Sequence, residues 1–322
     1  MAYNSTNEAN VVRQELYDAT LEKSLDDWLV GKPLFDDKTG MFPDGDTLNI
    51  TKTGDRAVSD YSEDSAISFD NMQTSRVDLT VTDYKQDGWY ITDKLKQDGH
   101  QAESFWAENV RKSAIAMERD LEKACFSIAN TGQTAGDLNA INGAAHRFLG
   151  GGTGGALQIE DIGAIKLAFD KAMVPTENRV LVISPEMEFE LNKLLNITEV
   201  SNGSQFNFNV DGMVQTGFGD RLNIIRNIYG INLMVSHNLP DVTDTITKYD
   251  GTGSATVTGG KLCVAMSMAD ASSMPIMGVI RQRPQSEFFR NTHYKRDEWS
   301  STCRYGFGLK RAETLATIVT PA

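Results

Sequence analysis

The sequence has few of the features that crosslink a protein or anchor it in a membrane. Among its 322 residues are three cysteines, Cys125, Cys263 and Cys303, and no pair of them has the CxxC spacing of a zinc or redox site. The longest strictly apolar run is five residues, Leu262 to Met266, whereas a helix that crosses a membrane needs about 20. We therefore predict three buried free thiols and no transmembrane helix.

Positive charge is also scarce. The chain has 44 acidic residues against 31 basic ones, a formal net charge of -13 at pH 7, which repels nucleic acid over most of the surface. Any contact with DNA or RNA is therefore expected to be local or indirect. The first thirty residues contain no basic cluster followed by an apolar stretch, so we expect no secretory signal and a reducing cytoplasm.

Recognisable catalytic and cofactor motifs are missing. The four histidines lie at least 46 residues apart, with no other histidine or cysteine at metal-ligand spacing, and no P-loop pattern occurs. Gly150, Gly152 and Gly155 match the GxGxxG pattern of dinucleotide sites, but a poor strand precedes them and no regular βαβ unit follows. A flexible loop is the better interpretation, and we predict no catalytic, cofactor-binding or metal site.

The rest of the sequence is that of a folded chain, 40% hydrophobic and 23% charged, long enough for two domains or one large discontinuous domain. Leu48 and Ile50 alternate with polar residues, and so do Val77, Leu79 and Val81, which predicts two β-strands. The stretch between the strands is acidic and too polar to be buried. We therefore predict a long hairpin that projects from the body.

A single long helix is predicted over residues 98–131. Apolar residues recur there at three- and four-residue steps, which places them on one face of the helix. This face consists of Trp106, Val110, Ala114, Met117, Leu121, Ala124 and Ile128. Glu108 lies off this face, so we expect it to be exposed and to pair only weakly with Lys112. A helix of this length, about 45 Å, is a structural element of a whole domain.

Beyond the glycine-rich stretch at 148–155, helical and strand patterns alternate. A helix is predicted at 162–173, before Pro175, and a second one begins at Pro185. Strands are predicted at residues 179–184, 222–228, 231–236, 261–268, 277–283 and 315–319. Gly230 is expected to turn the chain between the second and third of these. The predicted fold class is therefore α+β.

The order of these parts resembles the major capsid protein of tailed bacteriophages, with the HK97-like fold, and looks most similar to the shell proteins of short-tailed phages, the podoviruses. The resemblance covers nearly the whole chain. Four segments in the same order support it, at residues 76–93, 174–194, 221–240 and 305–319.

The resemblance implies a division of the chain into domains. Residues 1–40 would be an N-terminal arm and 45–95 an extended β-hairpin loop. The peripheral domain, with the long spine helix, would comprise 98–156 and 277–305. The α/β axial domain would comprise 157–276 and 306–322.

The resemblance also implies a function and partners. Hexamers and pentamers of the chain would self-assemble in the host cytoplasm into an icosahedral shell, a structural component of the virion that encloses packaged double-stranded DNA without sequence-specific binding. Expected partners are a separate scaffolding protein, a portal and, where one is present, a decoration protein, with no membrane and no cofactor. Family members that crosslink use a lysine and an asparagine, and we identify no such pair.

Two groups of residues are expected to carry this function. A lone hairpin is only marginally stable in water, so the long polar loop should be ordered by lying on an adjacent subunit. The contact residues expected there are Asp55, Arg56, Asp60, Tyr61, Glu63, Asp64 and Phe69. The core of the spine helix is expected to be Trp106, Val110, Met117, Leu121 and Ile128.

Two other functions fit the sequence less well. A bacterial encapsulin-type nanocompartment shell resembles the same fold, and purified particles would then contain a cargo protein in place of DNA. A soluble α/β nucleotide-binding enzyme would use the glycines of residues 150–155, which a thermal-shift screen with nucleotides would test.

Overall fold

The computed structural model of the chain describes residues 34–98, 102–196 and 227–321, apart from positions 43–44, 55, 57, 65, 68, 70 and 72–73. The helices are α1 (Asp93–Asp98), α2 (Ala102–Thr131), α3 (Ile159–Lys171) and α4 (Pro185–Asn196). The strands are β1 (Asp36–Asp37), β2 (Thr47–Thr53), β3 (Thr74–Thr80), β4 (Asp83–Thr92), β5 (Arg147–Leu149), β6 (Arg179–Ile183), β7 (Asn227–Ile228), β8 (Ile231–Val235), β9 (Asp241–Thr247), β10 (Ser254–Ser267), β11 (Ile276–Asn291), β12 (Arg296–Leu309) and β13 (Leu315–Thr320). Within these ranges, no helix is long and apolar enough to cross a membrane.

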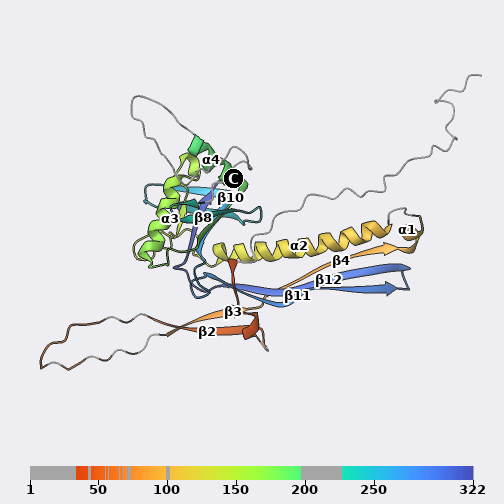
Figure 1. The fold of residues 1–322 in the computed structure, drawn as a ribbon, viewed down its shortest axis with the longest axis horizontal. Coiled ribbons are helices and arrows are strands. Elements are labelled where there is room, and N and C mark those ends of the chain that lie inside the picture. Colours follow the sequence, from red (N-terminus) through yellow and green to blue (C-terminus); the bar gives the residue numbers. More distant parts are fainter. Residues whose placement is uncertain are drawn as a thin grey trace, which may run out of the picture.

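The elongated half of the molecule is a four-stranded sheet in the order β1-β11-β12-β4, with α2 lying along one face (Figure 1). Alternate residues of β12 face the helix, and Trp299, Cys303 and Tyr305 among them are buried. Two aromatic contacts join the far end of α2 to this sheet, because the Trp106 ring lies 4.1 Å from Trp89 and 5.8 Å from Phe288. The face opposite α2 is called the outer sheet face below.

The compact half is a seven-stranded sheet whose main path is β5-β13-β10-β6-β8-β7, with β9 paired to β10. Helices α3 and α4 cover one face, where Ile165, Phe169 and Met187 pack on the sheet. The end of α2 covers the other face. Because both faces are covered, all five residues of β6 are buried and its apolar side chains alternate between the two cores.

The last turns of α2 lie between the two sheets and share one core with both of them. Phe126 and Cys125 are fully buried there, although the predicted apolar face contains neither. The residues expected in the helix core differ in burial: Met117 and Leu121 are buried, whereas Trp106, Val110 and Ile128 are half-buried and Ala114 is exposed. A helix covered from two sides is buried around more of its circumference than a single stripe predicts.

One prediction for α2 is wrong. Glu108 is buried, and its carboxylate accepts bonds from Arg111, 3.0 Å from Nε and 2.5 Å from Nη2. The expectation of an exposed Glu108 that pairs weakly with Lys112 took account of the apolar stripe alone. Arg111, three residues further along the helix, pairs with the Glu108 carboxylate, so this charge can be buried beside the apolar face of α2.

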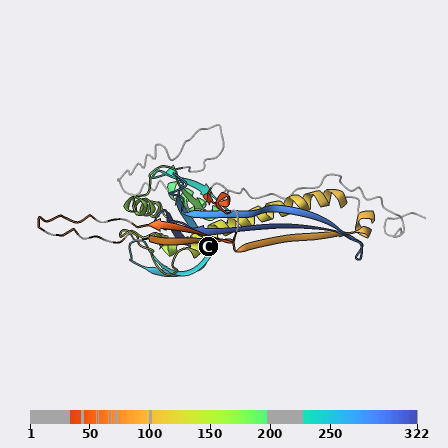
Figure 2. The same ribbon diagram turned by 90° about the horizontal axis from the view of Figure 1, so that it is seen from below.

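The predicted hairpin is confirmed. Strands β2 and β3 pair antiparallel from Thr47 opposite Thr80 to Thr53 opposite Thr74. Its base packs on the outer sheet face, where Leu79 and Val81 share a small core with Met277, Val279 and Phe42. Beyond this base the ribbon extends away from the body, in the direction opposite to the far end of α2 (Figures 1 and 2).

The expected extended loop, 45–95, includes residues of two different sheets. Strand β4 pairs with β12 along its whole length, from Asp83 opposite Tyr305 to Thr92 opposite Arg296, so it belongs to the four-stranded sheet. Within the expected peripheral segment 98–156, β5 pairs with β13 in the seven-stranded sheet. Strand β12 likewise continues past residue 305, to Leu309.

Gly306 of β12 lets the hairpin lie on the outer sheet face, and substituting it tests this attachment. A Cβ atom at this position would lie 2.8 Å from Val81 Cα and closer still to the Thr80 carbonyl oxygen, both of them backbone atoms. We expect Gly306→Ala to destabilise the subunit by about 1–3 kcal/mol, because the hairpin must shift outward. Urea unfolding measures the loss. Gly253→Ala, where a Cβ would meet nothing within 4 Å, is the control and should be nearly neutral.

Candidate functional site

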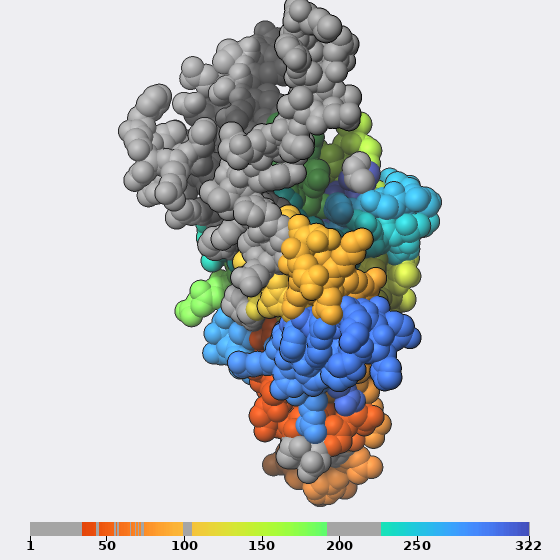
Figure 3. Space-filling model, turned by 90° about the vertical axis from the view of Figure 1, so that its right-hand side faces the viewer, coloured from red at the N-terminus to blue at the C-terminus, as the bar shows by residue number. Residues whose placement is uncertain are grey.

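The candidate functional surfaces are two exposed regions at opposite ends of the molecule and the outer sheet face between them. The first is the hairpin tip, residues 54–73, at the end of the β2–β3 ribbon. The second is the distal end, formed by α1, the end of β4 and the β11–β12 turn. Figure 3 looks onto the distal end, where the blue β11–β12 strands and turn lie below the yellow-orange start of the helices and above the orange-red hairpin.

The hairpin tip presents large apolar side chains to solvent. Val58 is 99% exposed and Phe69 92%, and Tyr61 and Ile67 are also exposed. Asp64 at the apex adopts a left-handed conformation, φ 66°, which aspartate tolerates better than most residues. Exposed apolar side chains on a ribbon with no covering layer mark a surface that another molecule covers.

The structure places most of the residues predicted for this contact together. All the described ones are exposed, on the two arms and the apex of the tip: Arg56, Asp60, Tyr61, Glu63, Asp64 and Phe69. Asp55 lies outside the described residues. The exposed Val58 and Ile67 were not among the predicted contacts, although as apolar residues in a polar stretch they could have been recognised.

None of the described residues covers the outer sheet face beyond the base of the hairpin. The strand register brings alternate residues of β4 and β12 side by side on this face, with Tyr84 opposite Arg304 and Tyr90 opposite Glu298. Both tyrosines and Phe289 of β11 are exposed. An exposed sheet face with an aromatic at both ends is suited to contact with a second flat element.

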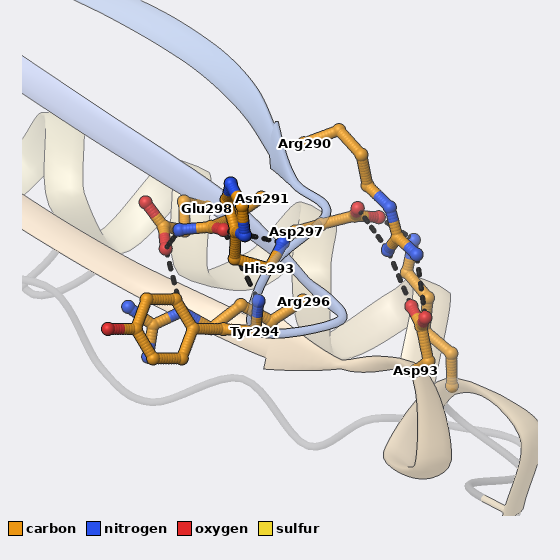
Figure 4. Close-up of polar contacts among 9 residues, drawn as sticks. Asp93, Arg290, Asn291, His293, Tyr294, Arg296, Asp297 and Glu298 are labelled. Carbon is orange, nitrogen blue, oxygen red and sulfur yellow. Dashed lines mark hydrogen bonds and ion pairs between the residues drawn. The ribbon is translucent and has the colours of Figure 1, made fainter.

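An ionic cluster holds the distal end together (Figure 4). Arg290 at the end of β11 binds Asp93 at the start of α1 with two parallel bonds, of 2.5 and 2.6 Å, and binds Asp297 of β12 at 2.7 Å. Lys96 of α1 binds the second oxygen of Asp297. The Arg290 bond lowers the pKa of Asp93, and bonds from Lys96 and Arg290 lower the pKa of Asp297.

The β11–β12 turn is ordered by a second set of contacts (Figure 4). The guanidinium of Arg296 lies 4.4 Å from the ring centre of Tyr90 and 4.8 Å from that of Tyr294. Its Nε donates to Glu298 at 2.6 Å, and Asn291 Nδ2 donates to the same oxygen at 2.9 Å. Arg296 thus lies beside two tyrosines, an arrangement that the sequence does not reveal because Tyr90 and Arg296 come from two different strands.

The ionic cluster predicts acid sensitivity at the distal end. Both aspartates have lowered pKa values in the folded state, so their stabilisation is complete above the ordinary pKa of 3.8 and is lost as the pH falls through the folded values. Lys96 Nζ lies 5.9 Å from the Trp106 ring, so tryptophan fluorescence should report the loss below about pH 4. Arg290→Gln should show the altered fluorescence already at neutral pH. A wild-type signal unchanged by acid would contradict the prediction.

An acidic side chain of the protein itself closes the glycine-rich turn. The buried carboxylate of Asp161 accepts bonds from the backbone N–H of Gly151, at 2.9 and 3.0 Å, and of Gln158, at 2.8 Å. It thereby occupies the N-terminus of α3, the position that a phosphate would take. A Cβ at Gly150 or Gly152 would lie within 2.7 Å of the Ala156 carbonyl oxygen, so these glycines permit tight chain packing.

Other chemistry has no visible basis in the described residues. Among them, no group of three or more His, Cys, Asp or Glu side chains could hold a metal ion. Cys125, Cys263 and Cys303 are free and buried, as predicted. Burial raises the pKa of Cys125 to about 12, and the pKa of Cys263 is raised still further. Both thiols are therefore unreactive at neutral pH.

Comparison with known proteins gives a family and a fold. The sequence matches the family described as phage capsid protein over residues 74–318. No curated protein matches it. Similar solved structures include one from Mycobacterium phage Che8 (19% identity, TM-score 0.67, covering 97% of this chain and 97% of that chain) and the mature capsid of bacteriophage PhiM1 (12%, 0.68, 96% and 92%). The capsid of the native GTA particle is another (11%, 0.65, 100% and 100%).

Proposed function

This chain belongs to the phage capsid protein family, and we propose that its copies join by placing the hairpin tip of one copy on the outer sheet face of the next. Its fold is the HK97-like capsid fold, and it is a major capsid protein that assembles into the icosahedral shell of a virion. The observation that supports this contact between copies is that the molecule has an exposed hairpin tip at one end and, toward the other end, an outer sheet face that none of the described residues covers. Contacts between two different surfaces close copies into rings.

Charge supports the same pairing. The hairpin tip carries five acidic residues and one basic residue. Residues 281–304 of β11 and β12 carry six basic and three acidic residues, and β4 adds one basic and two acidic residues, in a chain whose net charge is -13. An acidic ribbon and a locally basic sheet attract each other and set the register of the contact.

Sheet membership supports a domain assignment. We assign 1–40 to an arm whose end, β1, pairs with β11, and 45–82 to the extended loop. The peripheral domain then comprises 83–146 and 276–309, with the four-stranded sheet and α2 as its spine helix. The axial domain comprises 147–275 and 310–322, with the seven-stranded sheet.

The remaining proposals rest on the sequence resemblance. We propose a virion of the short-tailed type, assembly in the host cytoplasm with a separate scaffolding protein and a portal, and a decoration protein where one is present. We propose no enzymatic activity, since Asp161 occupies the glycine-rich turn that the enzyme alternative requires. The match to a phage capsid family favours a shell around DNA over an encapsulin-type compartment.

Electron microscopy of the expressed protein tests this function. Expressed alone or with its scaffolding protein, the chain should sediment as capsomers or shells in the megadalton range. Particles from infected cells should contain DNA, whereas an encapsulin-type shell would contain a cargo protein. A monodisperse monomer of 35.5 kDa at high protein concentration would contradict the proposal.

A further inference from the structure

A buried polar cluster joins the end of the long helix to the seven-stranded sheet. Arg147 of β5 is 1% exposed, and its Nη2 lies 2.9 Å from Asn130 Oδ1 in α2 and 3.1 Å from Asp244 Oδ2 in β9. Its Nη1 lies 3.5 Å from Gln133 Oε1, just beyond α2, and the same oxygen accepts a 2.5 Å bond from Thr317 of β13. We call these five residues the junction cluster.

A second buried contact fixes the same helix further along. Ser236, which follows β8, donates from Oγ to Glu122 Oε1 of α2 at 2.7 Å, and both residues are buried. Glu122 and Asn130 are eight residues apart, so the two contacts lie about 12 Å apart along the helix axis. Two fixed points on a rigid helix determine its direction relative to the sheet.

These contacts are directional, unlike the apolar packing around them. Packed helices can slide or rotate on an apolar surface by small shear motions, whereas Nη1 and Nη2 of a buried guanidinium, bound to α2, to the residue just beyond it and to β9, keep these bonds in one arrangement only. Asp244 is held in place independently, because it also accepts from Gly136 N at 2.9 Å. The junction cluster therefore specifies orientation in addition to contributing stability.

We propose that Arg147 is the positioning residue that sets the angle between the long helix and the seven-stranded sheet, and through it the curvature and diameter of the shell. This inference rests on the proposed function. Helix α2 is 30 residues long and packs along the four-stranded sheet, so a change in its direction moves that sheet and its outer face. At about 45 Å in length, a tilt of ~10° at the junction would displace its far end by ~8 Å.

The proposal has a consequence for how one chain fits both pentamers and hexamers. If the junction angle is held constant, the difference between the two environments must be accommodated elsewhere. The hairpin tip, whose described residues are exposed and make no core with the body, is the part that can adapt.

Arg147→Met tests the proposal, because methionine keeps the apolar stem and removes every hydrogen bond of the guanidinium. Arg179→Met is the matched control: Arg179 is 2% exposed and binds Asp170 and the carbonyl groups of Val174 and Pro175, all in the compact half. Both variants should lose stability. Only Arg147→Met should broaden the distribution of shell diameters in electron micrographs and produce misclosed particles.

A solution measurement separates orientation from assembly. Spin labels on cysteines introduced at Ala114 in α2 and Ser254 in β10, both exposed, report the distance between the two halves in unassembled subunits. This distance distribution should be narrow in the wild type and in Arg179→Met, and broad in Arg147→Met. If Arg147→Met does not fold, Asn130→Ala, which removes the acceptor that α2 offers to Arg147 Nη2, should give the same broadening.

Each outcome decides the question. Wild-type shells of one diameter with unchanged diameters and distances in both junction variants would overturn the inference and leave the capsid function intact. Equal broadening in Arg179→Met would also overturn it, because any loss of a buried arginine would then have the same effect. A wild-type chain that forms no shells would instead contradict the proposed function.

Discussion

Replacing residues 54–73 of the hairpin tip with Asn-Gly is expected to abolish closed shells and to leave the subunit folded. Thr53 and Thr74 are the last paired residues of the ribbon, so a two-residue turn can connect them. The core between the hairpin base and the sheet involves only residues outside the deleted segment. Circular dichroism and urea unfolding of the unassembled subunit measure folding, and electron microscopy measures assembly.

A second variant keeps the length of the hairpin tip and changes only its charge, so it separates the effect of the charge on assembly from the effect of the shape. Changing Asp60, Glu63 and Asp64 to Asn, Gln and Asn removes three charges and no backbone. Since charge complementarity chiefly affects the rate and register of association, this variant should assemble more slowly and with less sensitivity to salt. Arg304→Glu, on the outer sheet face where the hairpin tip of the neighbouring copy is proposed to lie, should impair the same contact. Normal shells from the shortened variant would show that the hairpin tip is not an assembly element.

The sequence predicts the local elements of this fold well and its long-range pairings poorly. The hairpin strands, the helices at 159–171 and 185–196, and the strands at 179–183 and 315–320 follow from periodicity and from Pro175 and Pro185. The periodicity does not predict strand β4, because its sequence, DYKQDGWYIT, has no regular alternation of apolar and polar residues. Its position depends on pairing with β12, more than two hundred residues away in the chain.

The candidate surfaces also differ in whether they depend on local sequence or on long-range pairing. The exposed hairpin tip could be predicted because its acidic composition and its length are local properties of residues 54–73. The Arg296 contact with Tyr90 and Tyr294 could not, because the first tyrosine comes from β4 and is brought there by the sheet register. The junction cluster also depends on four elements, α2, β5, β9 and β13, that only the tertiary fold brings together.

Phe126→Ala is expected to cost the subunit about 3–5 kcal/mol of unfolding free energy, because the side chain is fully buried and the cavity lies in a core shared by both sheets. Phe105→Ala in the same helix is the matched control. Its side chain is 52% exposed, so the loss should stay below about 1 kcal/mol. Urea unfolding of the unassembled subunits measures both.

The position of Phe126 also predicts how the variant unfolds. In a Trp28→Phe background the remaining tryptophans, Trp89, Trp106 and Trp299, all lie in the four-stranded sheet or in α2, so their fluorescence reports the elongated half, whereas circular dichroism reports the whole chain. If the end of α2 couples the two sheets, the two signals should change together in the wild type and at different urea concentrations in Phe126→Ala. Coincident transitions in the variant, together with a loss no larger than that of Phe105→Ala, would mean that the long helix is not the element that unites the two halves.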